Sequence, residues 1–213
     1  MKIKAIKIIS FLLIFCVLLY SVSRVFRFKG NDSFDATHTF YKQPKNSIDV
    51  LFLGSSHVHF DIDPAILYKE YGISSYNFSS SSQTLLNSYF RLKEALKTQK
   101  TKLIILEGYI LSAYDYTSYD MPHIFMSGIF SMHFSLNKVN LIKLQIPKNR
   151  WNEFFNPFYT YHNKYSSLSI SDFIQSDYIK FVKGLTITYN VMNLNKNNTF
   201  TEEKLPLTDI VEE

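Results

Sequence analysis

The chain has 213 residues, 46% of them hydrophobic, which is long enough for one folded domain plus an anchor and too apolar for a disordered chain. Its net charge of +5 comes from scattered lysines and arginines that are densest around the first apolar run, and no nucleic-acid-binding motif is present, so we expect no nucleic-acid partner. The single cysteine, Cys16, excludes an internal disulfide, and no Cys/His cluster has zinc spacing, so we expect no metal and no cofactor. The abundance of Tyr, Phe, Asn, Lys and Ile is typical of an AT-rich bacterial genome.

An uncharged apolar run, Ile8–Ser23, follows three lysines at the N-terminus. Its sixteen residues span about 24 Å as a helix, and Lys7 and Arg24 can snorkel, so a single transmembrane helix is feasible. A cleaved signal peptide is the alternative, because residues 21–23 (Ser-Val-Ser) form a passable cleavage site. The run exceeds a usual signal core, so we favour an anchor over residues 1–29, in the cell membrane, with the domain outside the cytoplasm.

Residues 30–47 are polar and predict a stalk ahead of an α/β domain that we place at residues 48–213. The first strand is predicted at residues 48–53, a nearly continuous apolar run of the kind buried on both faces of a sheet. A short helix should begin at Asp63-Pro64, where an N-cap aspartate precedes a first-turn proline, and end at Gly72.

Two further strands are predicted at residues 73–78 and 102–106, the latter also buried. Between them we expect a helix whose core face consists of four residues at helical spacing: Leu85, Tyr89, Leu92 and Leu96. Strand–helix–strand–helix–strand within roughly sixty residues predicts right-handed βαβ units and a parallel sheet. Another helix is expected at residues 136–146.

Three polar loops follow the three strands, at residues 54–57, 79–84 and 107–109. Ligands of open parallel sheets bind at the carboxyl ends of the strands, so these loops predict a site. The first is a tight turn with two serines, Ser55 and Ser56. A serine there can be a nucleophile if a base accepts its proton, and its own N–H can point at an oxyanion. The alternative is that both serines only cap the following segment.

Residues 51–57, Leu-Phe-Leu-Gly-Ser-Ser-His, resemble the first sequence block of the SGNH (GDSL-like) hydrolase superfamily, where Gly-Asp-Ser follows the first strand. The resemblance implies a three-layer αβα, flavodoxin-like parallel sheet, complete or incomplete at its C-terminal end. It also implies Ser56 as the catalytic nucleophile, with Ser55 at the aspartate position. The Gly-Ser-Ser form is similar to the membrane-anchored, envelope-facing branch, which includes the D-alanyl-transfer accessory protein of teichoic acid synthesis and the alginate O-acetylation proteins.

Residues 76–84 resemble the second block of the family, usually Asn-Leu-Gly-x-x-Gly-Gln/Asp-Thr. Ser82 stands where the family has a glycine that donates its backbone N–H to the oxyanion, and serine tolerates positive φ less well than glycine. We expect His57 to line the pocket or bind substrate. The resemblance thus implies a set of oxyanion- and substrate-binding residues around Ser56: Gly54, Ser55, His57, Ser82 and Gln83.

Two further blocks of the family pattern are not matched. Residues 107–109, Glu-Gly-Tyr, occupy the place of Gly-x-Asn-Asp, and no Asp-x-x-His follows near the C-terminus. Asp120 and His123 have that spacing but come directly after the third strand, so we treat them as weak candidates, more simply explained as a chance match. We therefore expect a chain that is C-terminally truncated or belongs to a degenerate branch. Residues 59–63 alternate His, Asp and Asp, which we interpret as solvated loop polarity, not a metal site.

These patterns leave three functional hypotheses open. The first is a serine esterase or O-acyltransferase that acts on acylated cell-envelope glycans or similar molecules through an acyl-Ser56 intermediate. The second is a non-catalytic, membrane-tethered accessory protein that docks with a membrane acyltransferase or polymerase. The third is an anchored α/β domain of unrelated function. In each case the lipid bilayer is an expected partner.

Overall fold

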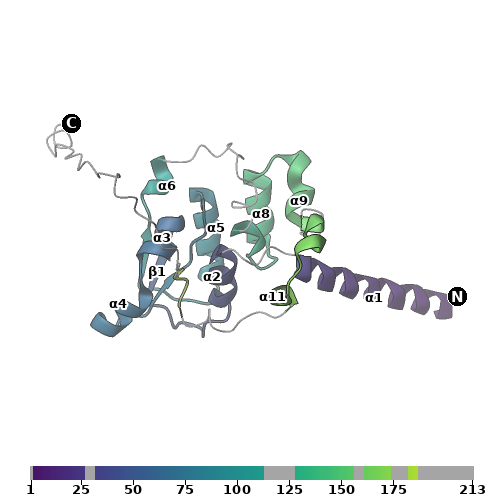
Figure 1. The fold of residues 1–213 in the computed structure, drawn as a ribbon, viewed down its shortest axis with the longest axis horizontal. Coiled ribbons are helices and arrows are strands. Elements are labelled where there is room, and N and C mark those ends of the chain that lie inside the picture. The colour runs from purple at the N-terminus through teal and green to yellow at the C-terminus, as the bar shows by residue number, and fades with distance from the viewer. Residues whose placement is uncertain (1, 27–31, 113–127, 156–160, 174–181, 187–213) are drawn as a thin grey trace.

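The computed structural model describes residues 2–26, 32–112, 128–155, 161–173 and 182–186, drawn in colour in Figure 1. Within them, three parallel strands form one sheet: β1 (Val50–Leu53), β2 (Ser75–Asn77) and β3 (Leu103–Leu106), in the order β2-β1-β3. Leu51 of the central strand lies opposite Tyr76 on one side and Ile104 on the other. The predicted parallel α/β arrangement is confirmed.

Helix α4 (Pro64–Tyr71) begins and ends where its capping residues predict. The Asp63 carboxylate accepts hydrogen bonds from the amides of Ala65, at 2.8 Å, and Ile66. These bonds satisfy amides that have no partner within the helix. At the other end Gly72 adopts a left-handed conformation (φ 68°), which glycine reaches without a Cβ penalty.

Helix α5 (Leu85–Ala95) forms as predicted, but only half of the apolar stripe assigned to its core is at least partly buried. Leu92 is partly buried and packs against the core beneath the sheet. Tyr89 and Leu96 are each about half exposed, at 52% and 51%. Its buried positions are instead largely polar: Asn87, Ser88, Phe90, Arg91, Glu94 and Ala95. Tertiary hydrogen bonds make this burial possible. The Arg91 guanidinium, for example, donates to Thr37 Oγ1 at 2.8 Å and to the Gly128 carbonyl at 2.7 Å.

The region expected to be a stalk contains helix α2 (Asp32–Phe40), which is part of the core. Phe40 is buried and stacks on Phe78 with ring centroids 4.0 Å apart. The Tyr76 hydroxyl donates to the Ala36 carbonyl at 2.7 Å. Alternate strand residues share a face, so α2 and α5 cover the same face of the sheet through one cluster of buried side chains: Phe40, Ile48, Leu51, Leu53, Tyr76, Phe78 and Ala95.

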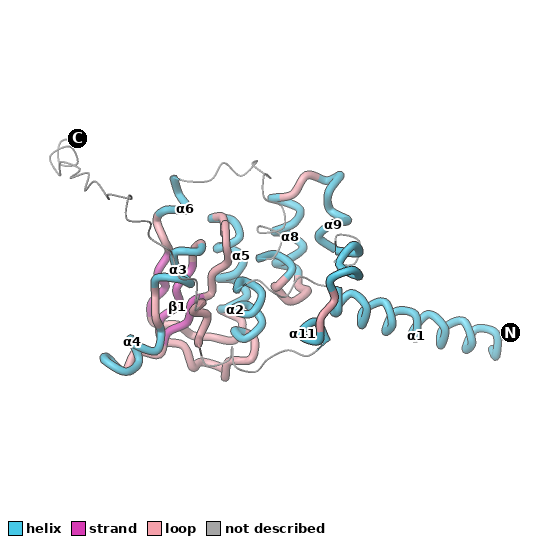
Figure 2. The backbone as a smooth tube through the Cα atoms, viewed as in Figure 1, coloured by secondary structure: helices cyan, strands magenta, loops and turns pink. Residues whose placement is uncertain are grey.

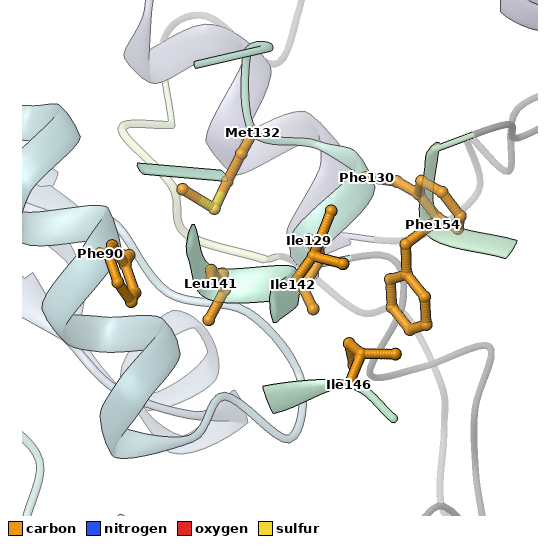
Figure 3. Packing of buried hydrophobic residues seen from close by; sticks show 8 residues of the cluster. All are labelled: Phe90, Ile129, Phe130, Met132, Leu141, Ile142, Ile146 and Phe154. Atoms are coloured by element: carbon orange, nitrogen blue, oxygen red, sulfur yellow. The ribbon is translucent and has the colours of Figure 1, made fainter. Parts of the chain in front are cut away.

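A second core lies between α5 and the helices that follow the sheet (Figure 3). Helix α8 (Leu136–Gln145) packs along α5 and confirms the helix predicted there. It is followed by η1 (Lys148–Arg150), α9 (Trp151–Phe155), η2 (His162–Ser167) and α11 (Ile170–Phe173). The core residues come from α5, the segment before α8, α8 with its C-cap, and α9: Phe90, Ile129, Phe130, Met132, Leu141, Ile142, Ile146 and Phe154.

Helix α1 (Lys2–Phe26) projects away from the rest of the described chain (Figures 1 and 2). Its apolar window, Lys4–Ser23, is 20 residues long, and none of its residues is buried against the rest of the chain. At 1.5 Å per residue it spans about 30 Å, the thickness of a bilayer's hydrocarbon core. This helix could therefore be a signal anchor, although a signal sequence near the N-terminus would have the same character.

Strand β3 forms at the predicted place, but its predicted burial is wrong for the described part of the chain. It lies at an edge of the described sheet, and its four side chains are 39–51% exposed. The central strand β1, by contrast, is almost completely buried, as its apolar run predicts.

Candidate active site

The carboxyl end of the central strand carries the turn that was singled out from the sequence. Strand β1 ends at Leu53, and helix α3 (Ser56–Asp61) begins at Ser56 after only two residues. The Ser80 amide donates to the Gly54 carbonyl at 3.4 Å, and the Ser55 amide donates to Glu107 Oε2 at 2.5 Å. Because Ser80 follows β2 and Glu107 follows β3, all three predicted loops meet at this edge of the sheet.

Glu107 organises the turn, and sequence reasoning gave it no role. Besides the Ser55 amide, its carboxylate accepts the Ser55 hydroxyl at 3.0 Å and lies 2.7 Å from Nδ1 of His57. The His57 ring also packs edge-on against Tyr109, with centroids 4.7 Å apart. The available signal was an acidic residue at the end of a strand predicted to neighbour the serine turn. Comparison with the third block of the resembled family, Gly-x-Asn-Asp, indicated only that its asparagine is absent here and gave no role to the glutamate.

Gly54 leaves the space that Glu107 occupies. A Cβ at this position would lie 2.5 Å from Glu107 Oε2 and 2.6 Å from Val58 Cγ2, much closer than real Cβ contacts. Any larger residue must therefore displace the carboxylate or the first turn of α3. The glycine of the Gly-Ser-Ser block is thus explained by close packing, since its φ is not in the left-handed region.

The two serines of the turn have different environments. Ser55 is buried, with 1% exposure, and its hydroxyl is held by Glu107. Ser56 is only partly buried, and among the described residues no hydrogen bond engages its Oγ. Ser56 is therefore the serine whose hydroxyl is available to a ligand, whereas Ser55 fixes the shape of the turn.

The loop after β2 contains a residue in an uncommon backbone conformation. Ser82 has a φ of 53°, in the left-handed region that favours glycine, at the position where the resembled family has glycine. A non-glycine residue held in this region costs free energy and is typical of functional loops. Gln83 is fully buried: it accepts from the Ser80 hydroxyl at 3.0 Å and donates to the Ser88 hydroxyl at 2.9 Å. Gln83 therefore shapes the loop from within.

His59 is buried beneath the turn, contrary to its interpretation as part of a solvated loop. Its Nδ1 lies 3.1 Å from the Ser79 hydroxyl, whereas its Nε2 is buried without a hydrogen-bond partner among the described residues. Burial, helped by the nearby Arg91 charge, lowers the pKa of His59 to about 4, so the ring is neutral at pH 7. The sequence did not indicate the burial of His59, because it alternates with Asp61, which is exposed, and Asp63, which caps α4.

A segment distant in sequence, residues 182–186, lies against β2 and α3 beneath the site. The Asn77 amide donates to the Lys183 carbonyl at 3.0 Å, and the Thr186 amide donates to the His59 carbonyl at 2.7 Å. Gly184 has a φ of 82°, and a Cβ there would collide with the Asn77 carbonyl oxygen. No local sequence signal could have indicated this approach.

Asp120 and His123, the weak candidates for a catalytic pair, lie outside the described residues. Of the other predicted site residues, the structure places Gly54, Ser55 and His57 around Glu107, with Ser56 next to them in the turn. The loop that contains Ser82 contacts this turn through the hydrogen bond from the Ser80 amide to the Gly54 carbonyl. No family model, curated protein or solved structure matches the chain.

Proposed function

We propose that this chain carries an SGNH-type domain, with the three-layer αβα arrangement of that superfamily, that acts as a serine esterase or O-acyltransferase on acylated cell-envelope glycans. The observation that carries the proposal is the contrast between the two serines at the end of the central parallel strand. Ser56 is partly exposed and its hydroxyl is not engaged within the described chain, whereas Ser55 is buried against Glu107. In open parallel sheets, this edge is where ligands bind.

In the proposed reaction, Ser56 Oγ attacks the ester carbonyl carbon and forms a new C–O bond as its proton passes to a base. The ester C–O bond then breaks, and the leaving alcohol takes that proton. In the second half, water or a sugar hydroxyl gives its proton to the base and attacks the acyl carbon of acyl-Ser56. The bond between this carbon and Ser56 Oγ breaks, Oγ takes the proton from the base, and the acyl group leaves on the acceptor oxygen. The backbone N–H groups of Ser56 and Ser82 are the proposed donors to the oxyanion, and the left-handed φ of Ser82 supports its part in this role.

The proposal assigns proton transfer to His57. With Nδ1 donating to Glu107 at 2.7 Å, the other ring nitrogen, Nε2, is left as the proton acceptor. A carboxylate that fixes the imidazole tautomer and stabilises the imidazolium has the same function in serine hydrolase triads. This assignment differs from the substrate-binding role expected from the sequence alone. It supplies a base even though the terminal Asp-x-x-His block is missing.

Fluorophosphonate labelling of the full-length protein in detergent tests the proposal. The wild type should be labelled, and Ser56→Ala should abolish the labelling. Ser55→Ala is the matched control, because it alters the neighbouring hydroxyl and leaves the nucleophile in place. It should label more slowly but still label. His57→Ala should label at least about 100-fold more slowly. Labelling that survives Ser56→Ala would remove Ser56 from the nucleophile role.

A non-catalytic accessory role is the second candidate, and one observation favours it. Glu107 replaces the asparagine donor of the family's third block, and its carboxylate is committed to Ser55 and His57. A domain that keeps the pocket without the chemistry would dock with a membrane acyltransferase or polymerase. A wild type that is folded, unreactive to fluorophosphonate and co-purifies with a multi-span membrane partner would establish this role.

A further inference from the structure

The last turn of α1 is where the membrane-spanning candidate meets the folded part of the chain. Along the apolar window the side chains are exposed, but Ser23, Val25 and Phe26 are partly buried. The elements η2 and α11 lie against α1, beside its end nearest the rest of the chain (Figure 1). Because the apolar window ends at Ser23, this contact begins where the helix would leave the hydrocarbon core.

We call residues 161–173, which contain η2 and α11, the juxtamembrane segment. Its charged groups face inward: Lys164 pairs with Asp172, both largely shielded, and Asp172 also accepts the Ser169 amide at 2.9 Å. Tyr161, at its start, packs against the second core. Three of its other large apolar side chains face outward among small polar residues, since Tyr165, Ile170 and Phe173 are 65–78% exposed. A short segment that shields its ion pair and exposes large apolar side chains is typical of a surface that binds an apolar partner such as a membrane or another protein.

We propose that the juxtamembrane segment inserts Tyr165, Ile170 and Phe173 into the boundary between headgroups and acyl chains of the bilayer that α1 crosses. The partner is lipid because the segment contacts α1 at the end of its apolar window, level with that boundary. Tyrosine is favoured at this depth, where its ring is buried and its hydroxyl stays hydrated, and Ile and Phe gain by leaving water. The proposal rests on α1 remaining in the membrane and is independent of the chemistry at Ser56.

Site-directed spin labelling of the full chain in lipid nanodiscs tests this placement. The only cysteine, Cys16, is first replaced by alanine, and single cysteines are introduced at positions 165, 170 and 173 for nitroxide labels. The control label is placed at Tyr71, which is 72% exposed on α4, away from α1 in Figure 1. Collisions with oxygen, which enters lipid, are compared with collisions with a water-soluble nickel complex.

Labels at the three juxtamembrane positions should lose nickel collisions while keeping oxygen collisions, whereas the label at position 71 should collide with both. Nickel collisions equal to those at position 71 would overturn the proposal. Loss of both kinds of collision would also overturn it, because a protein surface, either a partner or a second copy, would then cover the segment.

A pair of charge variants keeps the proposal testable independently of the labels. Ile170→Asp should restore nickel collisions at a label on position 165 in nanodiscs. Tyr71→Asp, an equally exposed position, should leave them unchanged. Both variants alter exposed side chains, so their melting temperatures in detergent should equal that of the parent. If Ile170→Asp retains the parent's collision pattern with unchanged stability, the segment does not depend on lipid contact.

Discussion

At the residue scale, the space beside Gly54 determines whether Glu107 can hold the serine turn. In Gly54→Ala the added Cβ would meet the Glu107 carboxylate and Val58, so we expect a loss of stability on the order of 1–3 kcal/mol and a loss of fluorophosphonate labelling. Gly108→Ala is the matched control, because a Cβ there meets no atom within 4 Å. It should change stability by no more than about 0.5 kcal/mol.

Urea unfolding in detergent measures both glycine variants, and labelling rates measure the site. Equal stability of the two variants would contradict the packing argument. Unimpaired labelling of Gly54→Ala would show that the position of Glu107 does not matter to labelling at Ser56.

The buried His59 predicts how stability changes with pH. Its pKa is about 4 in the folded protein against 6.5 for an exposed histidine, so the unfolded chain binds more protons between these values. Stability from the neutral ring is therefore fully present above pH 6.5 and falls as the pH drops toward 4. The total loss is about 3 kcal/mol. Chemical unfolding between pH 4 and 7 measures this slope, and His59→Gln, which cannot titrate, should flatten it. The same slope in both proteins would contradict the assignment.

At the scale of single elements, the sequence predicted correctly those features that depend on a few neighbouring residues, such as the position of a strand and the ends of a helix. The apolar run of residues 48–53 predicted β1, and Asp63 and Gly72 predicted the two ends of α4, because these features act within a few residues. Helix α2 was missed because Thr37 and Thr39 are polar. They are buried only through tertiary bonds, such as the 2.6 Å contact between Thr39 Oγ1 and the Tyr76 hydroxyl.

Helix α5 illustrates why the buried face of an element is harder to predict than the element itself. Hydrophobic periodicity places apolar residues in the core, but here the core face carries Arg91, which is completely buried. Within the part of the chain that the structure describes, its four hydrogen bonds go to neutral oxygens of α2, α5 and the segment before α8, so it joins three parts of the chain. Burial lowers the pKa of Arg91 to about 10, which still leaves it charged at pH 7.

The candidate site also has features that local sequence determines and features that depend on long-range contacts. The serine turn could be predicted because the end of a strand and a sequence block define it locally. The left-handed conformation of Ser82 was not predicted, because serine adopts it less readily than the glycine of the resembled family. The roles of Glu107 and His59 and the approach of residues 182–186 depend on contacts between segments 20 to 127 positions apart, as in the bonds of His59 to Ser79 and Thr186. Such contacts follow from the packed fold and leave no pattern in the neighbouring sequence.

At the scale of the whole molecule, α1 decides whether the domain works at the membrane. The helix continues without interruption through Ser21 and Ser23, the passable cleavage site, to Phe26, and its last turn packs against η2 and α11. Cleavage after Ser23 would remove the membrane span and leave Val25 and Phe26 as a short end. We therefore expect the mature protein to retain the helix as a single-pass anchor.

Intact-mass measurement of the C-terminally tagged protein, expressed in a bacterial host, checks this expectation. The mass should include residues 1–29, and an alkaline carbonate wash should not extract the protein from membranes, because a transmembrane helix resists treatments that break polar contacts. Ser23→Leu removes the small residue that cleavage requires and is the control: it should leave mass and localisation unchanged. A soluble product that begins at Arg24 in the wild type, and that Ser23→Leu converts to the full-length membrane form, would identify α1 as a signal peptide. It would also remove the bilayer as the surface beside the juxtamembrane segment.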